Sequence, residues 1–185
     1  MTDGFKYKTN WCVITGAPSS GKTSVIKELA HRGYAIQGEV ARELIEIGIN
    51  QGRSLDNIRQ DVGDFQKGIL EVALAREMAL DLNMTVFLDR GLPDSITYFK
   101  LAGIDGFEAS AISLLFQYRA VFIFDRLPIV KDDVRTEDEA LANKIDKMLE
   151  ADYNSVGYNP IRVPVLPIEK RADFILSKLN IKQNQ

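Results

Sequence analysis

The chain has 185 residues, of which 45% are hydrophobic and 26% are charged, and its formal net charge is −3. These proportions are those of an ordinary globular protein, so we expect residues 1–185 to form a single domain. The acidic balance argues against a surface that coats nucleic acid, and no apolar run approaches the length needed to cross a bilayer. The single cysteine, Cys12, excludes a disulfide within the chain and favours a reducing, cytoplasmic setting.

A glycine-rich loop follows the first predicted strand, which runs from Trp11 to Thr15. Residues 16–23 read Gly-Ala-Pro-Ser-Ser-Gly-Lys-Thr and match G-x-x-x-x-G-K-[ST] at every fixed position, and a helix is predicted over 24–31. In this context the pattern predicts a phosphate-binding loop, in which backbone N–H groups converge on phosphate oxygens, Lys22 reaches the β- and γ-phosphates and the Thr23 hydroxyl ligates Mg²⁺. The residues expected to contact the nucleotide here are Gly16, Ala17, Pro18, Ser19, Ser20, Gly21, Lys22, Thr23 and Ser24.

Strand-like and helix-like segments alternate along the rest of the chain. Apolar runs predict further strands over 34–37, 85–89, 120–125 and 161–165. Helical patterns begin near Gly38, Ser54, Pro93 and Thr136, and two more cover 107–118 and 168–179. Five strands separated by helices predict an α/β fold, a parallel sheet with helices on both faces.

The helix predicted after Ser54 carries a regular apolar stripe. The stripe consists of Leu55, Ile58, Val62, Phe65, Ile69 and Val72. Continuing the spacing brings Arg76 onto it, where this side chain could contact a substrate phosphate or carboxylate, or extend past the sheet edge to solvent. Gln66 could read a base or amide edge, or face solvent.

Charged residues follow the second and third predicted strands, at the strand ends where ligands bind in such folds. Glu39 follows the second strand, and Asp89 and Arg90 follow the third. A carboxylate at the position of Asp89 can hold Mg²⁺ through water or take the proton of an attacking hydroxyl, although a helix cap or turn would use the same residue type. The Arg90 guanidinium can balance phosphoryl charge.

The segment after the fourth strand is predicted to be a lid, over about residues 126–136. Arg126 and Arg135 are expected to neutralise charge on the transferring group and to exclude water, which would compete as the acceptor. For Lys131 and Asp132, an alternative is a solvated loop in which charged side chains pair with one another.

The chain resembles single-domain AAA-type P-loop ATP-binding proteins related to nicotinamide riboside kinases and to nucleoside and nucleotide kinases. The motifs that carry this resemblance are the phosphate loop, Gly38-Glu-Val-Ala-Arg-Glu43, Leu88-Asp-Arg-Gly-Leu-Pro-Asp94, Asp132-Asp-Val-Arg-Thr136, Gly157-Tyr158 and Val163-Pro164. The resemblance implies the three-layer P-loop NTPase fold with kinase-like sheet order 2-3-1-4-5. It also implies that the purine ring lies at Val165, and that the protein is a monomer or homodimer rather than a ring.

These observations predict a Mg²⁺- and ATP-dependent kinase that transfers phosphate to a hydroxyl of a small nucleoside-like metabolite, with GTP left open as the donor. The predicted catalytic residues are Lys22, Glu39, Asp89, Arg90, Arg126 and Arg135, and the predicted metal-binding residues are Thr23 and Asp89. Either Glu39 or Asp89 could be the base. The alternative is an NTP hydrolase or nucleotide-dependent switch that controls a protein or lipid partner. We expect no nucleic-acid partner and no membrane insertion.

Overall fold

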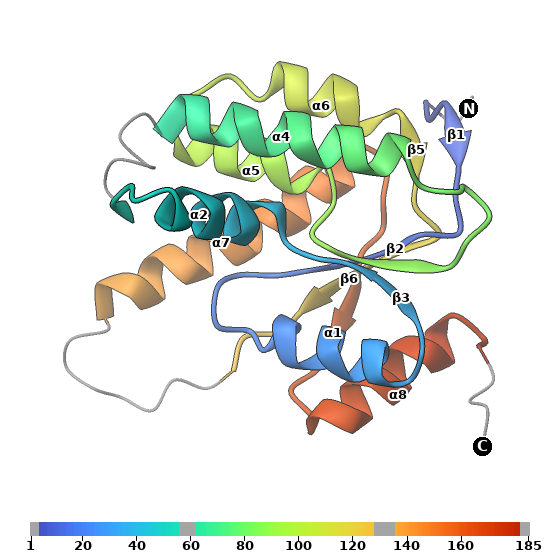
Figure 1. The fold of residues 1–185 in the computed structure, drawn as a ribbon. Coiled ribbons are helices and arrows are strands. Elements are labelled where there is room, and N and C mark those ends of the chain that lie inside the picture. Colours follow the sequence, from blue (N-terminus) through green and yellow to red (C-terminus); the bar gives the residue numbers. More distant parts are fainter. Residues whose placement is uncertain (1–3, 56–61, 128–135, 182–185) are drawn as a thin grey trace.

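A computed structural model of the chain describes residues 4–55, 62–127 and 136–181 (Figure 1). Most of the predicted lid lies outside these ranges, and with it Lys131, Asp132 and Arg135. Ile58 of the predicted apolar stripe is also outside them. Among the described helices, none is both long and apolar enough to cross a membrane.

A five-stranded parallel sheet forms the middle of the structure, in the order β3-β4-β2-β6-β7. Its strands are β2 (Cys12–Thr15), β3 (Ala35–Gln37), β4 (Val86–Asp89), β6 (Ala120–Phe124) and β7 (Ile161–Val163). Counted along the chain, this is the order 2-3-1-4-5, so the predicted kinase-like sheet is confirmed. Ile14 pairs with Asp89 on one side and with Phe122 on the other, which brings the loops after β2 and β4 together.

Helices cover both faces of the sheet, which gives three layers (Figure 1). The helices are α1 (Lys22–His31) and α8 (Ile168–Lys178) on one face, and α4 (Val62–Met78), α5 (Asp94–Leu101), α6 (Phe107–Ser113) and α7 (Thr136–Ser155) on the other. A further helix, α2 (Val40–Asn50), packs against α4.

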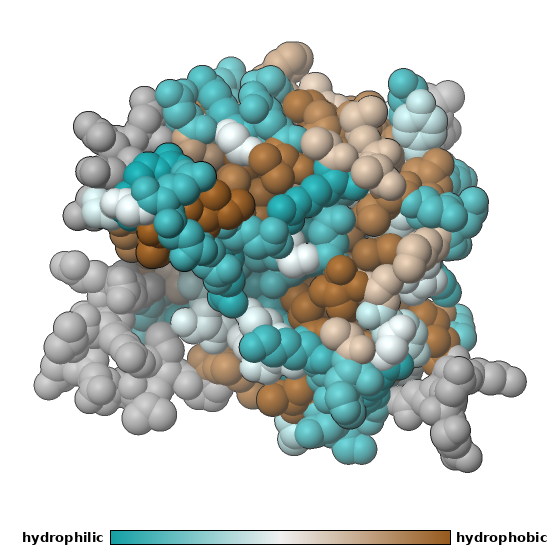
Figure 2. Space-filling view, viewed as in Figure 1, coloured by the Kyte–Doolittle hydropathy of each residue, from teal (hydrophilic) through white to brown (hydrophobic). Residues whose placement is uncertain are grey.

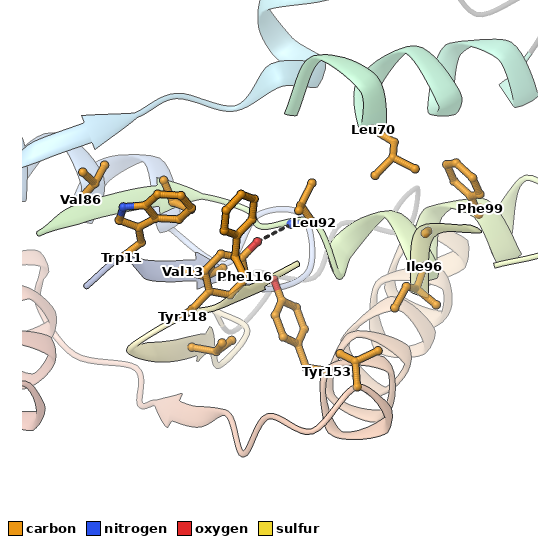
Figure 3. Close-up of a cluster of buried hydrophobic side chains, with 14 residues drawn as sticks. Trp11, Val13, Leu70, Val86, Leu92, Ile96, Phe99, Phe116, Tyr118 and Tyr153 are labelled. Atoms are coloured by element: carbon orange, nitrogen blue, oxygen red, sulfur yellow. Dashed lines mark hydrogen bonds between the residues drawn. The ribbon is translucent and has the colours of Figure 1, made fainter. Parts of the chain in front are cut away.

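Alternate residues of each strand enter two different cores, because successive side chains point to opposite faces of a sheet. Cys12 and Ile14 of β2 join the core beneath α1 and α8, and burial raises the pKa of the Cys12 thiol to about 12. Val13 joins the core on the other face, with Trp11, Tyr118 and Tyr153 (Figure 3). Cys12 is therefore a buried core thiol.

The predicted helix over 107–118 is wrong at its C-terminal end. It ends at Ser113, and Phe116–Gln117 forms a short strand, β5, which pairs in parallel with β1 (Tyr7–Lys8). The ring of Phe116 packs against that of Trp11, with centroids 4.9 Å apart. This contact between distant parts of the chain outweighs the local helical pattern.

The apolar stripe of α4 faces a cavity instead of the core. Phe65 and Ile69 line this cavity, whereas Leu70 is the α4 residue buried in the core beside the sheet. Arg76 donates to the Glu43 carboxylate of α2 from its two terminal guanidinium nitrogens, Nη1 at 3.1 Å and Nη2 at 2.7 Å. Arg76 therefore pairs with another residue of the chain. The predictions were a contact with substrate or an extension past the sheet edge to solvent, and this pairing is neither.

Candidate functional site

The phosphate loop turns sharply from β2 into α1. Gly16 has φ +145° and Gly21 has φ +85°, and a Cβ on Gly16 would lie 3.1 Å from the carbonyl oxygen of Phe124. Gly21 is the N-cap residue of α1 and has no side chain with which to cap the helix. The first N–H groups of α1 are therefore available to an anion, as the motif predicts.

Lys22 folds back over the loop that precedes it. Its Nζ donates to the carbonyl oxygens of Gly16 at 2.8 Å and Ala17 at 3.0 Å, and to Ser20 Oγ at 3.2 Å. Burial, with a smaller contribution from the positive charge of Arg90, lowers the pKa of Lys22 to about 8. The ammonium group is thus held inside the ring of backbone that would surround a phosphate.

A second tight turn, Asp89 to Gly91, lies beside the phosphate loop. Arg90 has φ +73°, and its backbone N–H donates to the carbonyl oxygen of Ile14 at 3.0 Å. A Cβ on Gly91 would lie only 2.8 Å from Cγ2 of Val13, so the turn packs directly on β2. This packing explains why glycine follows Arg90 in the sequence.

The Arg90 guanidinium connects the residue before α2 with the first residue of α5. Its Nε donates to Glu39 Oε1 at 2.8 Å and its Nη1 to Asp94 Oδ1 at 2.9 Å, and the group lies 5.0 Å from the centre of the Tyr98 ring. Burial works against ionisation of Glu39, but the charges of Arg90 and Lys22 hold the pKa of that carboxyl below its ordinary value. Glu39 and Arg90 therefore form a charged pair at the ends of neighbouring strands.

Asp94 is a residue of the site that the sequence analysis did not single out. Besides Arg90, it accepts hydrogen bonds from Thr15 Oγ1 at 2.6 Å, from the Gly91 N–H at 3.1 Å and from the Tyr153 hydroxyl at 2.6 Å. Asp94 thus connects three parts of the fold, which are β2, α7 and the turn after β4. Its position four residues after Arg90, at the first turn of α5, was the available signal.

Asp89 has a free oxygen at the end of β4. The residue is 9% exposed, and its Oδ1 is buried without a hydrogen-bond partner among the described residues. Burial, and then the negative charge of Glu39, raises the pKa of Asp89 to about 6. An unpartnered carboxylate oxygen in a cavity that Thr23 also lines is a donor set that fits Mg²⁺.

These residues line one cavity of about 920 Å³. It extends from the phosphate loop and the ends of β3 and β4 to walls supplied by α2, α4, α5 and α7. Much of its wall is apolar. Ile45, Phe65, Ile69 and Ala73 line it from α2 and α4, and Leu101 and Ile145 line it from a cluster that includes Ala17 of the phosphate loop. Gln66 lines the same cavity. Apolar side chains also reach the outer surface of α2, seen as brown atoms at the left of Figure 2.

Glu77 is a second polar residue that the sequence analysis missed. It lines the cavity, is only 2% exposed, and its Oε2 accepts a hydrogen bond from the Tyr118 hydroxyl at 2.7 Å. That hydroxyl accepts one from the Leu92 N–H at 3.0 Å (Figure 3). Burial raises the pKa of Glu77 to about 8. The apolar stripe indicated that Arg76 faced inward, whereas the spacing of seven residues from the buried Leu70 would have indicated Glu77.

The predicted site residues divide into two groups. Lys22, Thr23, Glu39, Asp89 and Arg90 line the cavity together with Pro18, Ser19, Ser20 and Gly21. The residues predicted to contact the nucleotide or transferring phosphate that do not line it are Gly16, Ala17, Ser24, Arg126 and Val165. Arg126 instead donates to Asn143 of α7, and Val165 is 45% exposed in the loop after β7. Arg135 lies outside the described residues.

Solved structures with this fold include several kinases. The NadR protein in complex with NR aligns with a TM-score of 0.69 at 16% identity, over 96% of this chain and 53% of that one. Deoxyadenosine kinase from M. mycoides, with dCMP and dCDP bound, aligns with a TM-score of 0.61 at 19% identity, over 92% and 98%. Thymidylate kinase from Ehrlichia chaffeensis aligns with a TM-score of 0.63 at 13% identity, over 92% and 97%.

The chain spans only about half the length of the NadR chain. At these identities the likeness is one of fold. No curated protein shows significant similarity in sequence. The AAA domain family, however, matches residues 11–171, most of the chain. The chain therefore belongs to the AAA domain family and has the fold of the P-loop kinases.

Proposed function

We propose that the protein is a Mg²⁺- and ATP-dependent kinase whose acceptor is a hydroxyl group of a small nucleoside-like metabolite. The observation that carries this proposal is the shared cavity. One continuous space includes the phosphate loop, the free oxygen of Asp89 and an apolar compartment beneath α2 and α4. Its volume of about 920 Å³ lies at the upper end of the range for small-molecule sites and leaves room for an acceptor beside the phosphates.

In this proposal the phosphate loop and Lys22 hold the phosphates of ATP, with GTP as the alternative donor. The N–H groups at the start of α1 and the Lys22 ammonium supply positive charge to the same place. Thr23 and, through water, Asp89 would hold Mg²⁺, which offsets negative charge on the β- and γ-phosphates. Structures of the same fold contain AMP-PNP and dATP, which supports nucleotide binding by this chain.

The transfer step forms one bond and breaks another. The acceptor hydroxyl oxygen bonds to the γ-phosphorus, the bond from that phosphorus to the ADP oxygen breaks, and the hydroxyl proton passes to a carboxylate. We favour Asp89 as the base, because its Oδ1 has no hydrogen-bond partner among the described residues, whereas Glu39 already accepts a hydrogen bond from Arg90. Glu39 would orient the acceptor hydroxyl, and Arg90 would balance the developing phosphoryl charge.

The apolar wall supports an acceptor that carries a ring. Ile69 and Ala73 offer flat apolar contact, while Gln66 and Glu77 of the same helix offer hydrogen-bonding groups. A nucleoside combines an apolar ring face, polar ring edges and sugar hydroxyls, which matches this arrangement. The roles predicted for Arg126 and Arg135 stay predictions, because Arg126 bonds α7 here and Arg135 lies outside the described ranges.

A screen of metabolite mixtures tests the proposal. The protein is incubated with Mg·ATP and pools of nucleosides and related alcohols, and products are identified by a mass gain of one phosphate. We expect at least one pool to yield such a product and to raise ATP consumption well above its rate without acceptor. If ATP consumption instead responds only to a protein or lipid fraction, the nucleotide-dependent switch replaces the kinase.

A further inference from the structure

A buried arginine lies beneath the phosphate loop and has no role in the mechanism above. Arg171, near the start of α8, is only 2% exposed. Its Nη1 donates to the carbonyl oxygen of Ser20 at 2.7 Å, and its Nε donates to the carbonyl oxygen of Pro164 at 3.0 Å. One side chain therefore joins the phosphate loop to the loop that follows β7.

The Arg171 charge is not neutralised by an ion pair among the described residues. Its Nη2 is buried without a hydrogen-bond partner there, and burial lowers the pKa of the guanidinium below its ordinary value. Asp125 attracts it, but the Asp125 carboxylate faces Arg162 at 3.6 Å. The Phe124 ring, whose centre is 5.2 Å away, gives further contact. An unneutralised buried cation is unfavourable for folding, so its presence calls for a compensating role.

The bond to Ser20 fixes the direction of a peptide in the phosphate loop. In a planar trans peptide the C=O and N–H groups point in opposite directions. Because the Ser20 C=O points at Arg171, the N–H of Gly21 in the same peptide points away from it, and Gly21 lines the cavity. A Cβ on Gly21 would lie 3.2 Å from Nη1, so the guanidinium packs against the loop itself.

The bond to Pro164 acts in the same way on the loop after β7. It sets the direction of the peptide between Pro164 and Val165, and hence of the Val165 N–H. Two peptides, more than 140 positions apart in the chain, are thus oriented by one rigid planar group. Holding these peptides before a ligand binds would lower the cost of ordering them on binding.

We propose that Arg171 is a positioning residue for nucleotide binding, which fixes the Ser20–Gly21 peptide of the phosphate loop by anchoring it to the loop after β7. The inference rests on the ATP-binding part of the proposed function and requires no acceptor. Arg171 acts through the backbone of Ser20 and Pro164 and is not itself a catalytic residue.

Calorimetric titration with ATP tests this role in three variants, at a temperature where circular dichroism finds each of them folded. Arg171→Met removes the charge and both donors, and Arg171→Lys keeps the charge but has one nitrogen in place of the two that donate to the carbonyl oxygens of Pro164 and Ser20. Arg32→Met is the matched control, because Arg32 also bonds α8, through Asp173 at 2.8 Å, on a surface away from the cavity.

We expect the Kd for ATP to rise about tenfold or more in Arg171→Met, since charge-assisted hydrogen bonds of this kind are lost. The Kd of Arg171→Lys for ATP is expected to lie between those of Arg171→Met and the wild type. If Arg171→Met does not fold, the comparison of Arg171→Lys with the wild type is the test. Arg32→Met should stay within about twofold of the wild type.

A folded Arg171 variant with the wild-type Kd overturns the inference and leaves only a structural role, seen as a lower unfolding temperature. Equal weakening in Arg32→Met overturns it as well, because the effect would not be specific to the loops. These titrations contain no acceptor, so a protein that binds ATP but transfers no phosphate contradicts the kinase proposal alone. Failure of the wild type to bind ATP contradicts both.

Discussion

Arg90 and Glu39 form a salt bridge in which Nε of Arg90 lies 2.8 Å from Oε1 of Glu39. The same guanidinium bonds Asp94 at 2.9 Å, so Arg90 keeps one anionic partner when Glu39 is neutralised. We therefore expect Glu39→Gln to leave the fold and ATP affinity nearly unchanged. If Glu39 orients the acceptor, this variant loses acceptor-dependent turnover and retains the slow hydrolysis of ATP. Steady-state rates with and without acceptor check this, and equal loss of both rates would remove the acceptor-side role.

Asp89→Asn should separate chemistry from packing. An amide has nearly the shape of a carboxylate but cannot take a proton or oppose Mg²⁺, so turnover should fall about a hundredfold or more while ATP affinity changes little. Because burial raises the Asp89 pKa to about 6, the ionised carboxylate destabilises the nucleotide-free fold above that pH. Denaturant unfolding at pH 7 should find the variant more stable, on the order of 1–3 kcal/mol. Wild-type turnover in this variant contradicts the assigned role.

Lys22 gives ATP binding a distinct pH dependence. Its pKa is lowered to about 8, and only the protonated ammonium attracts phosphate, so ATP affinity should decline as pH rises above about 8. The unfolded chain keeps this proton up to about its ordinary pKa of 10.5, so stability of the nucleotide-free protein should rise between these two pH values. Lys22→Met should bind ATP weakly and lack both trends. Calorimetry on the wild type at pH 7 and pH 9 checks this. If the Kd for ATP is the same at both pH values, the pKa of Lys22 is not lowered.

Glu77→Gln should stabilise the protein in a pH-dependent manner. The amide oxygen can still accept the Tyr118 hydrogen bond, whereas the carboxyl group must be buried in its ionised form at high pH. Since the folded pKa is about 8 and the ordinary value is 4.5, wild-type stability should decline relative to the variant as pH rises through this interval. Above about pH 8 the difference should be constant, at roughly 3–5 kcal/mol. Urea unfolding of both proteins at pH 5 and pH 9 measures this difference in the free energy of unfolding. If the difference is the same at both pH values, the pKa of Glu77 is not raised by burial.

The sheet and the phosphate loop could be predicted because their signals are local. Apolar runs such as 120–125 are typical of buried parallel strands. The glycines before Lys22 have positive φ, as the backbone of a phosphate-binding loop requires. The carboxyl ends of such strands meet at one edge, which brought Glu39, Asp89 and Arg90 together as expected.

The missed residues take their roles from contacts between distant parts of the chain. Spacing along α5 relates Asp94 to Arg90, but its role as a shared acceptor depends on Thr15 and Tyr153, which lie 79 and 59 positions away. Arg171 meets Ser20 across 151 positions. Glu77 was missed because the apolar stripe of α4 follows the cavity wall, which is apolar too, so the stripe did not identify the core-facing side.

Partition of the γ-phosphate tests the central claim most directly. ATP labelled at the γ-phosphate is incubated with the wild-type protein, Mg²⁺ and the nucleoside pool, and the label is separated into inorganic phosphate and organic phosphate ester. The kinase account predicts that most of the label appears in an ester, and that Asp89→Asn lowers the rate of ester formation about a hundredfold or more. Label found only as inorganic phosphate, at a rate that no pool changes, would contradict transfer to a small acceptor.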